Sequence, residues 1–137
     1  MALTHLLDTS VLTRLREPTV RGAIEPKAQR SELARPGISD LEIGFSARNA
    51  AEWDRLAEAV KAFELVETTA EHVRRARQVQ RLLASRHQRG RKVPDLLVAA
   101  CAEACGLAVL HYDADFDLIA AATGQSCEWV VPAGSID

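Results

Sequence analysis

Short apolar runs alternate with longer amphipathic segments along this chain. The apolar runs have the length of buried β-strands, whereas the amphipathic segments carry apolar residues three or four positions apart, which is the spacing of a helix. Strands separated by helices favour a parallel sheet, because parallel strands must be joined by crossover connections. Consecutive apolar residues within the strands indicate helices on both faces of that sheet. We expect strands at residues 4–8, 37–39, 63–68, 107–113 and 127–131.

Several of the intervening helices have clear start or stop signals. Thr69 is placed to begin a long helix that reaches about Arg86. Pro94 suits the first turn of a helix that Gly106 closes, and Gly124 closes the helix after the fourth strand. These signals make the second half of the chain the easier half to divide into elements.

The first half predicts three further helical segments. A short helix is expected over residues 10–16, and a polar, helix-compatible segment follows over 19–33. Ser39 or Asp40 is expected to cap a helix over 40–50. The next helix presents a core-facing stripe of apolar residues, namely Trp53, Leu56, Val60 and Phe63.

Length and composition narrow the class of protein. A chain of 137 residues has the size of one domain, so we expect a single domain over residues 1–137. The first residues lack the pattern of a signal peptide, and charges interrupt every apolar stretch before membrane-spanning length. We therefore expect a soluble, cytoplasmic protein with no membrane partner. Three cysteines, an odd number, favour reduced thiols over a disulfide framework.

The net charge of -2 hides a basic segment. No acid occurs between Glu71 and Asp95, whereas eight arginines and lysines do. Such a run is either the solvated face of a helix or a surface that binds a polyanion. The residues of this segment that we consider for RNA binding are Arg86, Arg89, Arg91 and Lys92.

Four acids follow the ends of predicted strands. Asp8 ends the first strand and Asp113 the fourth, while Glu42 and Asp95 fall in the first turn of helices. Any one of them could simply stabilise a helix start. However, the carboxyl ends of parallel strands lie at one edge of the sheet, where functional residues of such folds gather. We therefore expect the four acids to share one site.

A shared site for four carboxylates requires a cation. Two unit charges about 4 Å apart repel by about 4 kcal/mol at an effective dielectric constant of 20. Ligands that are all oxygen select a hard ion, Mg²⁺ or Mn²⁺ rather than zinc. Such an ion lowers the pKa of a bound water and neutralises charge on a phosphoryl oxygen, which suits phosphodiester cleavage.

Four stretches of the sequence, in this order and spacing, resemble the PIN domain, and most closely the VapC ribonuclease toxins of VapBC toxin-antitoxin pairs. They read LLDTSVL near the start, ISDLEIGFSA around Glu42, VPDLLVAACAEACGL around Asp95 and VLHYDADFDLIA around Asp113. The resemblance covers nearly the whole chain. It implies a three-layer α/β/α sandwich around a five-stranded parallel sheet in the order 3-2-1-4-5, which would put Asp8 beside Asp113.

The resemblance also implies roles for individual residues. It assigns the acidic, metal-binding and catalytic roles to Asp8, Glu42, Asp95 and Asp113. Ser10 matches a small polar residue that supports the metal site. Three further positions have other assignments. Asp115 caps the next helix or helps to hold a second ion, Thr9 is a cap, and Asp117 is a helix-start charge.

Members of the family act as dimers and cleave RNA with the help of a metal ion. A cognate antitoxin silences them by wrapping its C-terminal segment around the toxin and into its active site. The resulting hypothesis is an endoribonuclease that uses Mg²⁺ or Mn²⁺ to direct water at an RNA phosphodiester, leaving a 5′-phosphate and a 3′-hydroxyl. The alternative that stays open is a PIN-like protein that binds RNA or a partner and cleaves poorly.

Overall fold

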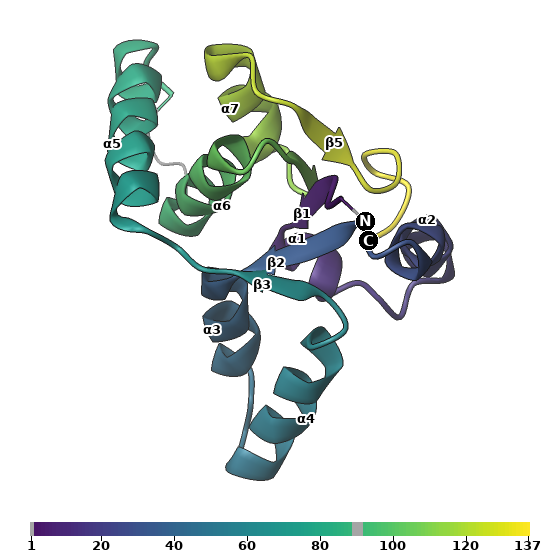
Figure 1. Ribbon diagram of the computed structural model, residues 1–137. Helices are drawn as coiled ribbons and strands as arrows, with labels where there is room; N and C mark the ends of the chain where they lie inside the picture. The colour runs from purple at the N-terminus through teal and green to yellow at the C-terminus, as the bar shows by residue number, and fades with distance from the viewer. Residues whose placement is uncertain (1, 89–91) are drawn as a thin grey trace.

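A computed structural model describes residues 2–88 and 92–137 and shows a parallel sheet through the middle of the molecule (Figure 1). Within these residues, the five strands follow the order β3-β2-β1-β4-β5, so the expected order is confirmed. All strand pairs are parallel. The strands are β1 (His5–Leu7), β2 (Leu33–Pro36), β3 (Glu64–Val66), β4 (Ala108–His111) and β5 (Cys127–Trp129).

Helices cover both faces of the sheet, as the apolar strands predicted. The side chains of neighbouring strand residues point to opposite faces: Leu6 and Val109 join one apolar cluster, whereas Leu7 and Leu110 join the other. The first cluster includes buried residues of α5, α6 and α7, and the second includes residues of α1 to α4. The helices are α1 (Thr9–Leu12), α2 (Pro18–Gln29), α3 (Gly37–Phe45), α4 (Ala50–Val60), α5 (Ala70–Ser85), α6 (Val93–Ala104) and α7 (Asp115–Thr123).

The second strand lies earlier in the chain than the pattern predicted. The sequence predicted residues 37–39, but β2 ends at Pro36 and α3 begins directly at Gly37. The prediction was wrong because Arg35 is buried inside the strand, where a cation is unexpected. Its guanidinium nitrogens Nε and Nη2 donate to the two carboxylate oxygens of Asp40 at 2.8 and 3.2 Å, and Nη1 donates to the backbone oxygens of Val60 and Phe63.

This pairing also explains why the expected cap of α3 is wrong. Asp40 serves as the partner of Arg35, and the N-cap residue is Pro36, which makes no side-chain cap hydrogen bond. Pro36 has an extended backbone at φ -82° and ψ 153°, so it ends the strand and starts the helix without a polar side chain. Arg35 thus fastens α3 and the end of α4 to the sheet.

Helices α3 and α4 form an arm that extends from the sheet (Figure 1). Val60 and Phe63 at its base are buried, as the predicted stripe requires. Trp53, by contrast, is 47% exposed and rests against Gly44 of α3. The stripe is therefore buried at its lower end, Leu56 is partly buried against the core, and Trp53 farther along α4 rests on α3.

The second half of the chain matches its sequence signals closely. The Thr69 hydroxyl accepts a hydrogen bond from the His72 backbone N–H at 3.3 Å, so Thr69 caps α5. Gly106 and Gly124 follow α6 and α7 at φ 69° and 76°, a backbone region that favours glycine. All three cysteines are free thiols. No helix of the described residues is both long enough and apolar enough to span a membrane.

Candidate active site

Asp8 lies where β1 passes into α1. Its backbone N–H donates to the Leu110 oxygen at 3.0 Å, which keeps β1 beside β4 up to the strand end. Its carboxylate caps α1 by accepting from the Ser10 backbone N–H at 3.0 Å. The side chain is buried among its neighbours. Asp8 therefore caps α1 and also lies at the edge of the sheet where the acids gather. Thr9, which was expected to be a cap, is instead the first residue of α1.

Asp95, Asp113 and Asp115 converge from three parts of the chain. One carboxylate oxygen from each lies within 4.8 Å of the others. Asp95 stands in the first turn of α6, Asp113 follows β4, and Asp115 begins α7. We call these three residues the aspartate triangle. It includes Asp115, for which the sequence left two roles open, a cap of the next helix or a ligand of a second ion. Asp115 is not the N-cap residue of α7, because that position is Ala114.

The partners of Asp95 and Asp113 differ sharply. Asp95 is buried, and among the described residues its Oδ2 atom has no hydrogen-bond donor. Asp113 accepts from the Asp115 backbone N–H at 2.9 Å and from the Lys92 ammonium at 2.5 Å. The Lys92 nitrogen lies 3.8 Å from Asp95 Oδ2, so one lysine reaches two corners of the triangle.

The pKa values of these acids follow their surroundings. Burial, with the charges of Asp8 and Asp113, raises the pKa of Asp95 to about 8. Burial also raises the pKa of Asp8, with the Glu42 and Asp113 charges adding to the effect. Burial is the largest effect on Asp113 and acts to raise its pKa, but the hydrogen bonds from Lys92 and the Asp115 backbone, together with the Lys92 charge, outweigh it and lower that pKa. The hydrogen bond to Asp113 also raises the pKa of Lys92.

Glu42 is held by the hydroxyl group of Thr9. It lies one turn later in its helix than predicted, because α3 begins at Gly37. Thr9 Oγ1 donates to Glu42 Oε1 at 2.7 Å and lies 3.0 Å from the hydroxyl oxygen of buried Ser39. The charge of Glu42 raises the pKa of Asp8, which places it on the Asp8 side of the site. Sequence reasoning missed this role of Thr9, although a hydroxyl directly after the strand-end acid was the available signal.

Ser10 connects α1 to the end of β4. Its hydroxyl oxygen accepts from the Tyr112 backbone N–H at 2.8 Å, while its own backbone N–H donates to Asp8. The side chain therefore fixes the spacing of the two strand ends that carry Asp8 and Asp113. The supporting role at the metal site that the sequence suggested for Ser10 stays a prediction.

His111 is a residue of the site region that sequence reasoning missed. Its ring is buried, stacks on Phe116 with 4.9 Å between ring centroids, and accepts the Asp113 backbone N–H at Nδ1 at 3.2 Å. Burial lowers the pKa of His111, which favours the neutral ring, whose Nδ1 atom can accept this hydrogen bond. The ring therefore orients the backbone at Asp113, and its place at the end of an apolar strand gave no sign of this.

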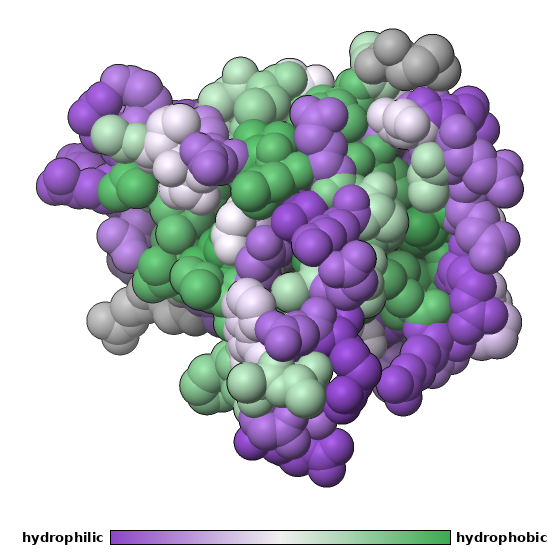
Figure 2. Space-filling view, turned by 60° about the horizontal axis from the view of Figure 1, so that its bottom comes forward, coloured by the Kyte–Doolittle hydropathy of each residue, from purple (hydrophilic) through white to green (hydrophobic). Residues whose placement is uncertain are grey.

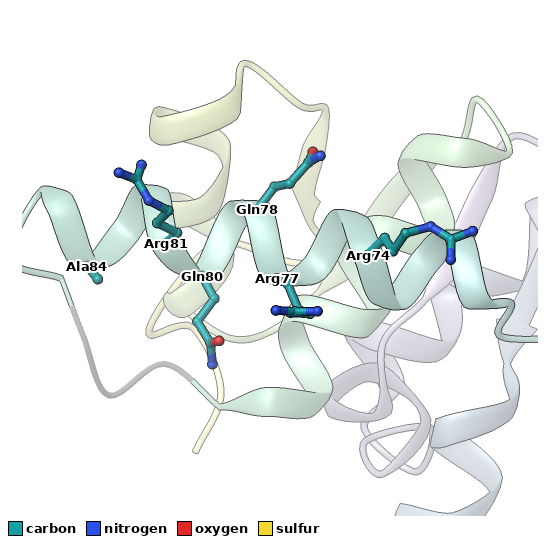
Figure 3. Close-up of a pocket in the computed structure, with 6 residues that line it drawn as sticks. All are labelled: Arg74, Arg77, Gln78, Gln80, Arg81 and Ala84. Carbon is teal, nitrogen blue, oxygen red and sulfur yellow. The ribbon is translucent and has the colours of Figure 1, made fainter.

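Two of the four basic residues that were considered for RNA binding, Arg86 and Lys92, lie within the described residues and have different partners. Lys92 contacts the aspartate triangle, and an Nη1 group of Arg86 donates to the Ala121 backbone oxygen at 3.5 Å. Arg89 and Arg91 lie outside the described residues. A different basic surface is evident along α5, where a shallow cavity is lined by Arg74, Arg77, Gln78, Gln80, Arg81 and Ala84 (Figure 3).

The donor set fits a hard divalent cation. Three carboxylate oxygens within 4.8 Å of one another can share one ion. A buried Asp95 oxygen that has no hydrogen-bond donor among the described residues is costly unless a cation or proton satisfies it. All of these donors are oxygen, which favours Mg²⁺ or Mn²⁺ over softer metals. Asp8 adjoins the triangle, while Glu42 is tied to Thr9.

Comparison with known proteins agrees with this arrangement. The PIN domain family matches residues 5–122. Ribonuclease VapC51 of Mycobacterium tuberculosis is 64% identical over 137 residues, all of both chains. Ribonuclease VapC21 of the same organism is 43% identical, covering 98% of this chain and 99% of its own. Among solved structures, DNA-bound VapBC from Salmonella typhimurium matches with a TM-score of 0.77 at 18% identity, over 94% of this chain and 99% of that one.

Proposed function

The chain belongs to the PIN-domain family and, within it, to the VapC ribonucleases, and we propose that it is a metal-dependent endoribonuclease toxin neutralised by a VapB-type antitoxin. The observation that carries the proposal is the aspartate triangle, in which the buried Asp95 Oδ2 has no hydrogen-bond donor among the described residues. A purely structural role does not explain why three carboxylates lie so close together, because their mutual repulsion destabilises the folded state.

The side chains divide the catalytic work between them. Asp95, Asp113 and Asp115 would hold Mg²⁺ or Mn²⁺ with Asp8 beside them, and the ion supplies an activated water and neutralises phosphoryl charge. Glu42, fixed by Thr9, is placed to orient that water or accept its proton at the edge of the site. In-line attack of water on an RNA phosphodiester would form a new P–O bond as the P–O3′ bond breaks. The departing 3′-oxygen would take a proton from solvent, which gives a 5′-phosphate and a 3′-hydroxyl.

The exposed face of α5 supplies a surface for the RNA backbone. Arg74, Arg77 and Arg81 follow one another at helical spacing and line the same shallow cavity (Figure 3). Exposed guanidinium groups in a row bind phosphates and release counterions, so their contribution falls as salt rises. We place the flanking RNA here, in addition to the residues nearer the aspartate triangle.

The arm offers a surface for the antitoxin. Its large apolar side chains are unusually exposed: Phe45 is 92% exposed, Leu41 69% and Trp53 47%. Figure 2, which brings the end of the molecule with α4 toward the viewer, shows apolar areas at the surface between hydrophilic ones. Exposed apolar patches of this kind mark protein interfaces. Structural neighbours of this chain are VapBC complexes, which supports assigning the arm to an apolar segment of the antitoxin.

Cleavage of a mixed RNA substrate by the purified protein tests the proposal. We expect cleavage with Mg²⁺ or Mn²⁺, none with EDTA, and a loss of at least about a hundredfold in Asp8→Asn and Asp95→Asn, since metal ions contribute several kcal/mol to such reactions. Asp54→Asn, an exposed position on α4, is the matched control and retains activity. Wild-type rates in both site variants would refute the site assignment.

The alternative function gives a different result in the same experiment. A PIN-like protein that only binds RNA or a partner would be stabilised thermally by Mn²⁺ but would release no cleavage product. Co-expression with the antitoxin gene provides the cellular test: growth should stop when this chain is expressed alone and recover when the antitoxin is present. Substitution of Phe45 by Ser should weaken that recovery without changing cleavage.

A further inference from the structure

The position of Lys92 is unusual for a residue beside a cation site. It is the N-cap residue of α6 and makes no side-chain cap hydrogen bond there. Instead, its ammonium reaches the aspartate triangle, 2.5 Å from Asp113 Oδ2 and 3.8 Å from Asp95 Oδ2. A bound cation would need these same two carboxylates.

The Lys92 side chain is exposed enough for its ammonium to move away from the carboxylates. Its side chain is 59% exposed, whereas those of Asp95 and Asp113 are 7% and 16% exposed. The acids are thus largely buried, and the cation that pairs with them is exposed and carried on a flexible four-carbon stem. The ammonium can move into solvent without disturbing the buried groups.

We propose that Lys92 is a built-in counter-cation that occupies the mouth of the aspartate triangle in the metal-free protein and is displaced when a divalent ion binds. This inference rests on the proposed function, because it requires the triangle to be the metal site. Lys92 thereby stabilises the free protein and weakens its apparent metal affinity, so the metal must compete with a tethered charge. Once displaced, the ammonium stays at the rim, where an RNA phosphate would arrive.

Metal binding without RNA tests the proposal directly. Isothermal titration with Mn²⁺ is compared for the wild type, Lys92→Met and Lys92→Arg, with Lys61→Met as the control. Lys61 also pairs with an exposed acid, Glu58, but lies on the arm. We expect Lys92→Met to bind Mn²⁺ about fivefold more tightly, since partly exposed ion pairs contribute up to about 1 kcal/mol. Lys92→Arg and Lys61→Met should stay close to the wild type.

Thermal unfolding provides a second measurement that does not depend on activity. Without metal, Lys92→Met should melt below the wild type, and saturating Mn²⁺ should remove the difference. Equal or weaker Mn²⁺ binding in Lys92→Met, while the wild type binds normally, would overturn the counter-cation role and leave the proposed function intact. If neither protein binds Mn²⁺, the proposed metal site fails and the inference fails with it.

Discussion

The two sides of the acidic site hold their carboxylates by different means. On one side, which we call the hydroxyl side, Asp8 and Glu42 accept hydrogen bonds from a backbone N–H and from the Thr9 hydroxyl. On the other, the aspartate triangle meets the charged ammonium of Lys92, and one oxygen of Asp95 has no donor among the described residues. Neutral donors fix geometry without changing charge, whereas the triangle is left with charge that an exchangeable cation must balance. The difference assigns orientation to one side and cation binding to the other.

The comparison predicts its largest effect at Asp95. Asp95→Asn keeps the shape of the side chain but removes an ionisable, metal-binding oxygen whose charged form burial and neighbouring acids disfavour. We expect metal-induced thermal stabilisation to disappear and RNA cleavage to fall at least about a hundredfold, while the metal-free protein becomes as stable as the wild type or more so. Differential scanning calorimetry with and without Mn²⁺ measures both changes. A variant that is less stable without metal would show that Asp95 is structural.

The second prediction concerns pH, and its sign follows from the raised pKa of Asp95. Folding raises this pKa from its ordinary value of 3.8 to about 8, so between these values the folded state holds a proton that the unfolded state has lost. The Asp95 contribution to stability is therefore full below pH 4 and is lost as pH rises toward 8. Relative to the wild type, Asp95→Asn should gain up to about 1.4 kcal/mol in unfolding free energy per pH unit over this range. Urea unfolding at several pH values checks it, and a constant difference would contradict it.

The hydrogen bond from Thr9 to Glu42 should have a smaller effect on turnover and almost none on metal binding. Thr9→Val preserves the shape of the side chain but removes the donor that holds Glu42. We expect cleavage to fall about tenfold, the order expected when a charge-assisted hydrogen bond is lost, with Mn²⁺ affinity within about twofold of the wild type. Thr9→Ser keeps the hydroxyl and is the control. If Thr9→Val also lost Mn²⁺ affinity, Glu42 would contribute to metal binding, and the division between the two sides would be wrong.

The same division explains what could be predicted from the sequence. Asp8, Asp95 and Asp113 were placed correctly because strand ends and helix starts are local signals, and the parallel sheet brings those ends together. The start of α3, and hence the place of Glu42, was missed because Arg35 is buried only through partners elsewhere in the fold.

The sequence also did not predict that Lys92 contacts the aspartate triangle, since this contact depends on how α6 packs beside β4. Its basic neighbours pointed instead to a common RNA-binding surface. Long-range contacts decide where charged side chains end up, and a local pattern carries no record of them.

The smallest effect is expected at Ser10, which joins the two sides without belonging to either set of acids. Ser10→Ala leaves the Tyr112 backbone N–H without its acceptor, so the unfolding free energy should fall by about 1 kcal/mol. Thr13→Ala is a suitable control, because that hydroxyl is exposed and makes two long contacts, 3.5 Å to the Ser10 backbone oxygen and 3.4 Å from Arg14 Nη1. If Ser10 acts only through strand spacing, Mn²⁺ affinity should change little and cleavage should fall by severalfold. A large loss of Mn²⁺ affinity with unchanged stability would instead show that the Ser10 hydroxyl acts directly on the metal site.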